Sequence, residues 1–177
     1  MPGNVVLIGL SGSGKSSVGR ELARRLEFRF VDTDDEIVAT AGKSIAEIFR
    51  DEGEAAFRAL ESRLVQGQCA AERRVISVGG GAALDPANRA AMLAGNHVVR
   101  LDAPDEVLVE RLRDDPAEER PLVKVGDPLA RMRDLRAQRE EVYAIAHRRV
   151  DTSGSPPGAI AAELAEWIGS RLRGGTG

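Results

Sequence analysis

The chain has 177 residues, a formal net charge of −3 at pH 7, and acidic and basic residues interspersed along its length. This length is typical of one domain, and the charge pattern offers no basic stripe for nucleic acid. The single cysteine, Cys69, excludes an intramolecular disulfide, and no apolar run reaches the ~18 residues of a membrane span. We therefore expect a cytoplasmic monomer with no nucleic-acid or membrane partner.

A phosphate-binding loop is predicted near the start of the chain. Val5–Ile8 form a short apolar run, and Gly9–Ser16 matches G-x-x-x-x-G-K-[ST] at every fixed position. Apolar residues then recur at helical spacing: Val18, Leu22 and Leu26. In this context the loop's N–H groups point at an anion, Lys15 supplies charge for the outer phosphates, and Ser16 supplies a hydroxyl for Mg²⁺. The pattern predicts a nucleoside triphosphate site.

Four further short apolar strands are predicted, with helical segments between them. Their ranges are Phe28–Val31, Val75–Val78, His97–Leu101 and Arg149–Asp151. This alternation predicts a three-layer α/β fold, in which helices flank a mostly parallel five-stranded sheet. Because ligands in such folds bind at the carboxyl ends of the strands, the residues that follow each strand are candidate site residues.

The helices are predicted from caps and apolar spacing. A capping box at Ser44–Glu47 starts a short helix that Gly53 ends. A longer helix from about residue 54 to residue 68 has a predicted buried stripe: Phe57, Leu60 and Leu64. Further helices are expected from residue 86 to about 93, after residue 104, from about 128 to 143, and up to residue 172.

Two segments are predicted to be mobile. Residues 114–127 combine two prolines, a glycine and dense charge, which is typical of a mobile surface segment. Residues 173–177 follow the last apolar helical position and should form a flexible tail. We expect residues 1–172 to form one domain.

Two carboxylates, Asp32 and Asp34, follow the second predicted strand. One interpretation is a helix start, with Thr33 or Asp34 as its cap and further acidic residues in the first turn. The other is functional, because Asp32 and Asp34 point the same way if the backbone stays extended. One carboxylate could then hold Mg²⁺, and the other could accept the proton of an attacking hydroxyl.

The third predicted strand ends in three glycines, Gly79, Gly80 and Gly81. They form either a flexible turn or a close backbone approach to a small polar ligand. The strand carries no acidic residue where many phosphate-loop enzymes have one that assists Mg²⁺. This favours Asp32 as the partner of that ion.

Three arginines could contact a substrate or lie on the solvated surface. Arg58 and Glu61 are three residues apart on a predicted helix, so they can pair. A half-buried pair would hold the guanidinium ready to fork onto a carboxylate, whereas a surface pair would contribute only ~0–1 kcal/mol. Arg139 lies on the helix after the mobile segment. Arg120 lies within that segment, from which it can swing onto a transferring phosphoryl group.

Together these features resemble the shikimate kinases, whose motifs occur here in the same order from about residue 4 to residue 168. The matching stretches are Gly9–Ser17, Asp32-x-Asp34, Phe57-Arg58 with Glu61, Gly79-Gly80-Gly81, Arg120-Pro121-Leu122, Arg139 and Val150-Asp151-Thr152. The resemblance implies a nucleoside-monophosphate-kinase-like P-loop fold. In that fold a mobile lid would span about residues 114–127, and substrate-binding helices would span about residues 34–64.

The resemblance also implies a reaction, in which the γ-phosphoryl group of ATP passes to the 3-hydroxyl of shikimate in aromatic amino-acid biosynthesis. Mg²⁺ would be the cofactor, held by Ser16 and Asp32. The implied ATP-binding residues are Gly12, Ser13, Gly14, Lys15, Ser16, Ser17, Arg113 and Arg120, with Arg111 as another candidate beside adenine. The implied shikimate-binding residues are Asp34, Arg58, Gly79, Gly80, Gly81 and Arg139.

The implied catalytic residues are Lys15, Asp34 and Arg120, with Asp34 as the candidate base. Two alternatives stay open from the residues alone. One is a related small-molecule kinase for gluconate or a nucleoside monophosphate, and the other is a nucleotide-binding switch that hydrolyses slowly. Dependence of ADP formation on the added acceptor separates all three.

Overall fold

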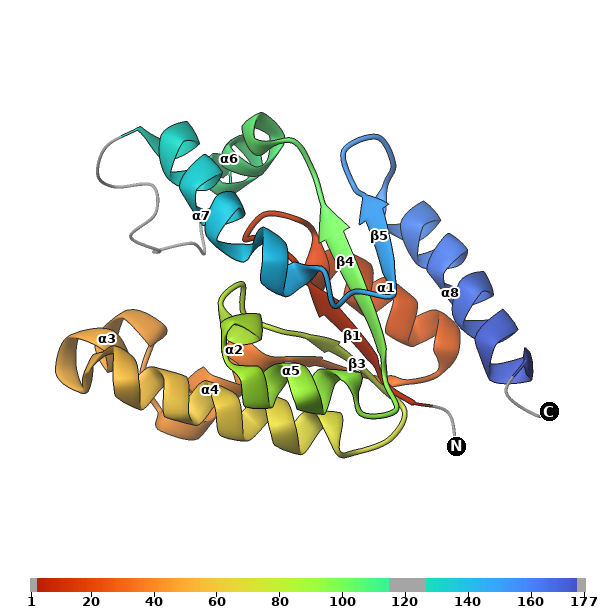
Figure 1. The fold of residues 1–177 in the computed structure, drawn as a ribbon, viewed down its shortest axis with the longest axis horizontal. Coiled ribbons are helices and arrows are strands. Elements are labelled where there is room, and N and C mark those ends of the chain that lie inside the picture. The colour runs from red at the N-terminus through yellow and green to blue at the C-terminus, as the bar shows by residue number, and fades with distance from the viewer. Residues whose placement is uncertain (1–2, 115–126, 175–177) are drawn as a thin grey trace.

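The computed structural model describes residues 3–114 and 127–174, in which strands and helices alternate along the chain (Figure 1). The strands are β1 (Val5–Ile8), β2 (Arg29–Asp32), β3 (Arg74–Ser77), β4 (His97–Asp102) and β5 (Arg148–Asp151). Neighbouring strands all pair in parallel, in the order β2-β3-β1-β4-β5. The predicted five-stranded parallel sheet is therefore confirmed, and each strand lies within one residue of its predicted range.

Helices occupy the connections between the strands. In the described part of the chain they are α1 (Lys15–Leu26), α2 (Thr33–Ala41), α3 (Ile45–Asp51), α4 (Gly53–Cys69), the short 3₁₀ helix η1 (Ala82–Leu84), α5 (Pro86–Leu93), α6 (Asp105–Asp114), α7 (Pro128–Tyr143) and α8 (Pro157–Gly174). The capping box of α3 is present, since the N–H of Ser44 donates to the Glu47 carboxylate at 2.8 Å. Gly53 ends α3 as expected but also starts α4, in a left-handed conformation with φ of +84°.

Two apolar layers enclose the sheet, because successive strand residues point to opposite faces. On β1, Val5 and Leu7 pack with α1 and α8, whereas Val6 and Ile8 pack with α4, α5, α6 and α7. All four of these side chains are fully buried. Figure 1 shows α1 and α8 side by side on one face, with α4 and α5 on the other. This burial on both faces explains why β1 is a continuous apolar run in the sequence.

The buried face of α4 differs from the predicted stripe. Its buried residues recur every fourth position: Phe57, Glu61, Val65 and Cys69. Leu60 and Leu64 are only partly buried, against a small cluster that joins α2, α3 and α4. Because Glu61 is charged, an apolar pattern could not place it on the buried face.

Two expectations concern the ends and surfaces of the chain. Helix α8 continues to Gly174, two residues beyond its predicted end at residue 172. No helix in the described ranges is long and apolar enough to cross a membrane. Residues 115–126, which form most of the predicted lid, lie outside the described residues.

Candidate active site

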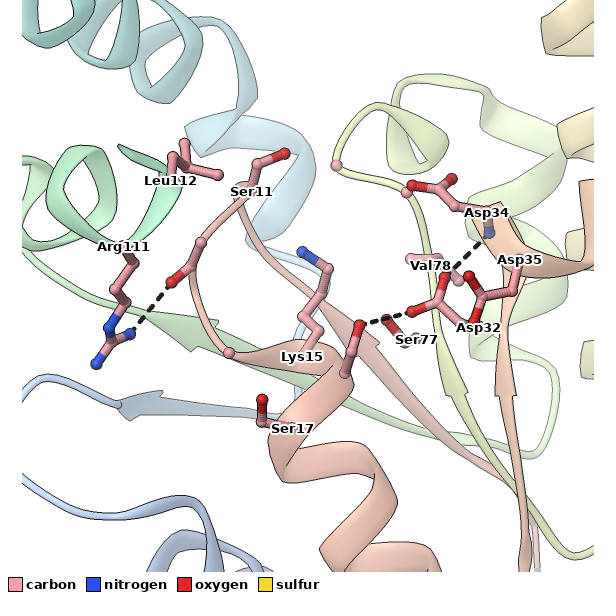
Figure 2. Close-up of a pocket in the computed structure, with 15 residues that line it drawn as sticks. Ser11, Lys15, Ser17, Asp32, Asp34, Asp35, Ser77, Val78, Arg111 and Leu112 are labelled. Carbon is pink, nitrogen blue, oxygen red and sulfur yellow. Dashed lines mark hydrogen bonds between the residues drawn. The ribbon is translucent and has the colours of Figure 1, made fainter. Parts of the chain in front are cut away.

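A pocket of about 450 Å³ opens beyond the carboxyl ends of β1, β2 and β3 (Figure 2). Its walls come from the phosphate loop, the first turn of α2, the loop after β3, and α6. The lining residues are Ser11, Gly12, Gly14, Lys15, Ser16, Ser17, Asp32, Asp34, Asp35, Ser77, Val78, Gly79, Gly80, Arg111 and Leu112. The pocket thus brings most of the predicted phosphate-binding residues together with Asp34 and two of the three glycines.

The phosphate loop presents a bare helix start to this pocket. Gly14 is the N-cap of α1 with φ of +91°, a left-handed conformation that glycine adopts readily, and no side chain in the described residues caps the helix. The ammonium of Lys15 donates to the carbonyl oxygens of Gly9 at 2.9 Å and Leu10 at 3.0 Å. Figure 2 shows it at the centre of the pocket, between Arg111 and the carboxylates. The N-terminal N–H groups of a helix, its dipole and a cation therefore converge where an anion would bind.

Asp32 connects the phosphate loop to α2 (Figure 2). The Ser16 hydroxyl donates to its Oδ2 at 2.6 Å, and the Asp34 N–H donates to its Oδ1 at 3.0 Å. Asp32 is therefore the N-cap of α2, where Thr33 or Asp34 was expected, and the helix already begins at Thr33. The extended backbone assumed for Asp32 and Asp34 is also wrong, because Asp34 lies in the first helical turn. Both carboxylates still line the pocket.

The donor set at this point suits Mg²⁺. Nowhere in residues 3–114 and 127–174 do three His, Cys, Asp or Glu side chains gather as metal ligands. The Ser16 hydroxyl and the Asp32 carboxylate do offer two hard oxygens that are in contact at 2.6 Å. Mg²⁺ typically takes one or two protein oxygens and completes its shell with phosphate oxygens and water.

A second group of charges surrounds the three glycines after β3. Arg58 Nη1 donates to Glu61 Oε2 at 2.7 Å, and the Glu61 side chain is 2 % exposed against 37 % for Arg58. The pair is thus half-buried, as the functional interpretation of Arg58 requires. Burial raises the pKa of Glu61 above its ordinary value, and the hydrogen bond from Arg58 opposes this rise.

The glycines leave room for these charged groups. A Cβ added at Gly81 would lie 2.8 Å from Arg58 Nη1, and one at Gly80 would lie 2.9 Å from Arg139 Nη1. At Gly79 it would lie 2.7 Å from Glu61 Oε1 and 3.1 Å from an oxygen of the Asp34 carboxylate. Two arginines and Asp34 therefore meet on one loop.

Helix α7 contributes two groups to that loop. Besides Arg139, it carries Tyr143, whose hydroxyl donates to the Gly80 carbonyl at 2.6 Å. Burial raises the pKa of Tyr143, so the phenol stays protonated as a donor at neutral pH. The buried Nε of Arg139 finds no hydrogen-bond partner within the described ranges. Sequence reasoning missed Tyr143, although its spacing of four residues from Arg139 places both on one helix face.

Arg111, and not Arg113, lies at the pocket. Its Nη1 donates to the Gly12 carbonyl at 3.2 Å, and its Nη2 donates to the Thr152 carbonyl at 2.7 Å. Arg113 is exposed and absent from the pocket lining, because two helical residues subtend about 200° around α6. Arg120 lies outside the described residues.

The sequence and the fold are similar to those of known proteins. The family model described as shikimate kinase matches residues 11–169. A shikimate kinase of Symbiobacterium thermophilum is 44% identical over 95% of this chain and 97% of its own. A shikimate kinase of Neisseria gonorrhoeae is 47% identical over 80% of this chain and 82% of its own. The solved structure of a shikimate kinase from Acinetobacter baumannii in complex with shikimate matches with a TM-score of 0.89 and 34% identity, covering 96% of this chain and 94% of that one.

Proposed function

The chain belongs to the shikimate kinase family, and from that premise we propose how its own residues divide the work of transferring a phosphoryl group from ATP to shikimate. One observation carries the assignment of the acceptor site. Arg58 from α4 and Arg139 from α7 both reach the Gly79–Gly81 loop, next to Asp34 and the phosphate loop. Shikimate is a small hydroxylated carboxylate, so two guanidiniums suit its charge and one carboxylate suits its reacting hydroxyl.

On the donor side, the N–H groups of residues 12–17 bind the ATP phosphates. Lys15 exchanges its bonds to the Gly9 and Leu10 carbonyls for the outer phosphate oxygens. We assign Arg111 to the nucleotide side in place of Arg113, because it lies against the phosphate loop. Arg120 is assigned to the transferring phosphoryl group by family resemblance alone.

On the acceptor side, Arg58 and Arg139 bind the shikimate carboxylate, and the Gly79–Gly81 backbone lies against the ring. Asp34 orients the 3-hydroxyl and accepts its proton as the phosphoryl group arrives. Because transfer of this kind is loose, holding the hydroxyl in line contributes at least as much as basicity does.

Mg²⁺ fits the oxygens of Ser16 and Asp32, where it would neutralise charge on the phosphates. Chelation of divalent cations should abolish ADP formation, and added MgCl₂ should restore it. Asp32→Asn should raise the Mg²⁺ concentration that gives half-maximal rate. Full turnover in EDTA would rule out this assignment.

The function itself is tested by acceptor dependence. ADP formation should require shikimate and should not be supported by gluconate or a nucleoside monophosphate. Equal ADP production with and without any acceptor would instead indicate a nucleotide-hydrolysing switch.

The role of Arg58 is tested by a matched pair of substitutions on α4. Arg58→Ala should raise the KM for shikimate at least about tenfold, the effect of losing one charge-assisted hydrogen bond, and leave that for ATP nearly unchanged. Arg63→Ala removes an exposed arginine from the same helix and should change neither. An unchanged shikimate KM in Arg58→Ala would reduce Arg58 to a structural partner of Glu61.

We also propose that the enzyme acts as a cytoplasmic monomer. The chain has one cysteine, Cys69, which is free and buried, as is common in a reducing compartment. Light scattering should give a mass near 18.9 kDa at micromolar concentration, and a mass twice as large would contradict the monomer.

A further inference from the structure

A cluster of charged side chains lies between β4 and α7. We call it the α7 clamp, and it consists of Arg100, Asp102, Arg136 and Glu140. Its centre is Asp102, which is 4% exposed at the end of β4. The Asp102 carboxylate accepts from Arg100 Nη2 at 3.0 Å, from Arg136 Nη1 at 2.8 Å, and from Arg149 Nη2 at 2.7 Å. One buried carboxylate thus receives three guanidiniums.

Arg100 links this centre to α7. Its side chain is 5% exposed, and its two terminal nitrogens donate to the two Glu140 carboxylate oxygens at 2.8 and 2.7 Å. This is the bidentate fork that fixes both distance and orientation. The guanidinium carbon also lies 5.3 Å from the centre of the Tyr143 ring.

The clamp grips one face of α7. Arg136, Glu140 and Tyr143 follow one another at intervals of four and three residues, so they lie along one side of the helix. Apolar packing also holds this helix, through its buried and partly buried residues Leu129, Met132, Leu135, Val142 and Tyr143. Arg136 adds a bond from its Nε to Asp105 at 2.7 Å. Charged bonds to β4 and α6 therefore act together with the apolar contacts to fix the rotation and height of α7.

That placement matters because α7 carries two groups of the acceptor site. Arg139 lies between Arg136 and Glu140 in the sequence, and its Nη1 is the nearest atom to a Cβ added at Gly80. Tyr143 donates to the Gly80 carbonyl at 2.6 Å. A shift or rotation of α7 would move both groups relative to the Gly79–Gly81 loop.

We propose that Asp102 and Glu140, acting through Arg136 and Arg100, are positioning residues for shikimate. They hold α7 so that Arg139 meets the acceptor carboxylate and Tyr143 holds the glycine loop. Buried ion pairs contribute little net stability compared with apolar residues of similar volume, but in some proteins they specify one arrangement of the elements that they join. This inference rests on the proposed role of Arg139 in binding shikimate.

The first test compares two adjacent glutamates of α7. Glu140 is 54% exposed, so Glu140→Gln removes the charge that accepts the Arg100 fork without burying a new group. We expect the KM for shikimate to rise about fivefold or more, in the range seen for residues in contact, while the KM for ATP stays within about twofold. Glu141→Gln, on the exposed neighbour, should leave both values unchanged.

A double-substitution cycle then separates positioning from general stability. Because Glu140 is proposed to act mainly through Arg139, Glu140→Gln should raise the shikimate KM much less when Arg139→Ala is already present. Asp102→Asn tests the other end of the clamp. It should likewise raise the KM for shikimate and leave the KM for ATP nearly unchanged. If Asp102→Asn fails to fold, the Glu140 cycle decides alone.

Three results would overturn the proposal. They are a Glu140→Gln enzyme that behaves like Glu141→Gln, equal increases in both KM values, and an undiminished effect in the Arg139→Ala background. A failure of the proposed function would give a different result, because the unmodified enzyme would then form no ADP when shikimate is added.

Discussion

Asp32 is the N-cap of α2, whereas Asp34 is the second residue of that helix, and these positions give the two carboxylates different partners. Asp32 uses both oxygens within the protein, for the Ser16 hydroxyl and for the Asp34 N–H. The Asp34 carboxylate instead points toward Gly79, where an added Cβ would lie 3.1 Å from its Oδ1. At the residue scale, this geometry supports the proposed division, with Asp32 on the donor side and Asp34 on the acceptor side.

Asp34→Asn should lower kcat by about 100-fold or more, because an amide cannot accept the proton of the attacking hydroxyl. The KM for ATP should change little, since the phosphate loop is intact. Steady-state kinetics with shikimate and ATP varied separately measure both values. Glu36→Gln, on the same helix but outside the pocket, is the control. A kcat within a few-fold of normal would remove Asp34 from the reaction.

Glu61 predicts a dependence of stability on pH. Burial raises its pKa above the ordinary value of 4.5, so the folded state holds this proton more tightly than the unfolded state. Stability from this group is therefore full below pH 4.5 and is lost as the pH rises through the folded pKa. Glu61→Gln removes that titration, so the Tm of the variant relative to the unmodified enzyme should rise as the pH increases above 4.5. A constant or falling difference would contradict the raised pKa.

At the scale of elements, the sheet could be predicted because its strands are short and its central strands β1, β3 and β4 are almost fully buried. The helix start at Ser44 could also be predicted, because a capping box is a local sequence signal. Helix α4 was harder, because its buried face includes Glu61. The N-cap of α2 is Asp32, and not Thr33 or Asp34, because of a side-chain hydrogen bond that residue spacing does not reveal.

Helix α1 packs so closely on the sheet that its one glycine, Gly19, has no room for a side chain. A Cβ at Gly19 would lie 2.5 Å from Phe30 Cε2 and 3.1 Å from Leu7 Cδ1. Gly19→Ala should therefore lower the free energy of unfolding by ~1–3 kcal/mol, in spite of the better helix propensity of alanine. Urea denaturation measures the change.

The matched control is Gly67→Ala on α4, where an added Cβ meets nothing within 4 Å. Here propensity acts alone, and stability should rise by ~0.5–1 kcal/mol. If the two substitutions changed stability in the same direction, close packing at Gly19 would not be the deciding term.

The site was only partly predictable, because the packing of the elements against one another decides which of some residues reach it. The phosphate loop, Asp34, Arg58 and the glycines are motif residues, and motif spacing finds them. Arg111 and Arg113 are both arginines on α6, and only the rotation of that helix selects Arg111. The α7 clamp was invisible in the sequence, because its bonds join β4 to a helix about 35 residues later.

At the scale of the whole molecule, the acceptor site depends on two helices that are distant in the chain. Arg58 comes from α4 and Arg139 from α7, and Figure 1 shows these helices as separate bodies around the sheet. The Gly79–Gly81 loop lies against both arginines. A ligand that contacts both therefore ties together two parts of the fold.

Shikimate alone should consequently stabilise the enzyme against heat. At about 100 times its Kd, binding adds ~2.7 kcal/mol, which corresponds to roughly 5–10 °C in Tm for a protein of this size. Arg139→Ala should lose most of this shift at the same concentration, whereas Arg63→Ala should retain it. A full shift in Arg139→Ala would show that α7 makes no contribution to binding.

The double use of Asp32 has a consequence for how the two substrates influence each other. Its Oδ2 receives the Ser16 hydroxyl, its Oδ1 caps the helix that carries Asp34, and Thr33 in that first turn accepts the Gly79 N–H at 3.2 Å. Nucleotide that draws Ser16 away from Asp32 thus acts on the start of α2 and on the glycine loop. We expect heterotropic cooperativity: ATP should change the affinity for shikimate, and shikimate should change the affinity for ATP by the same factor.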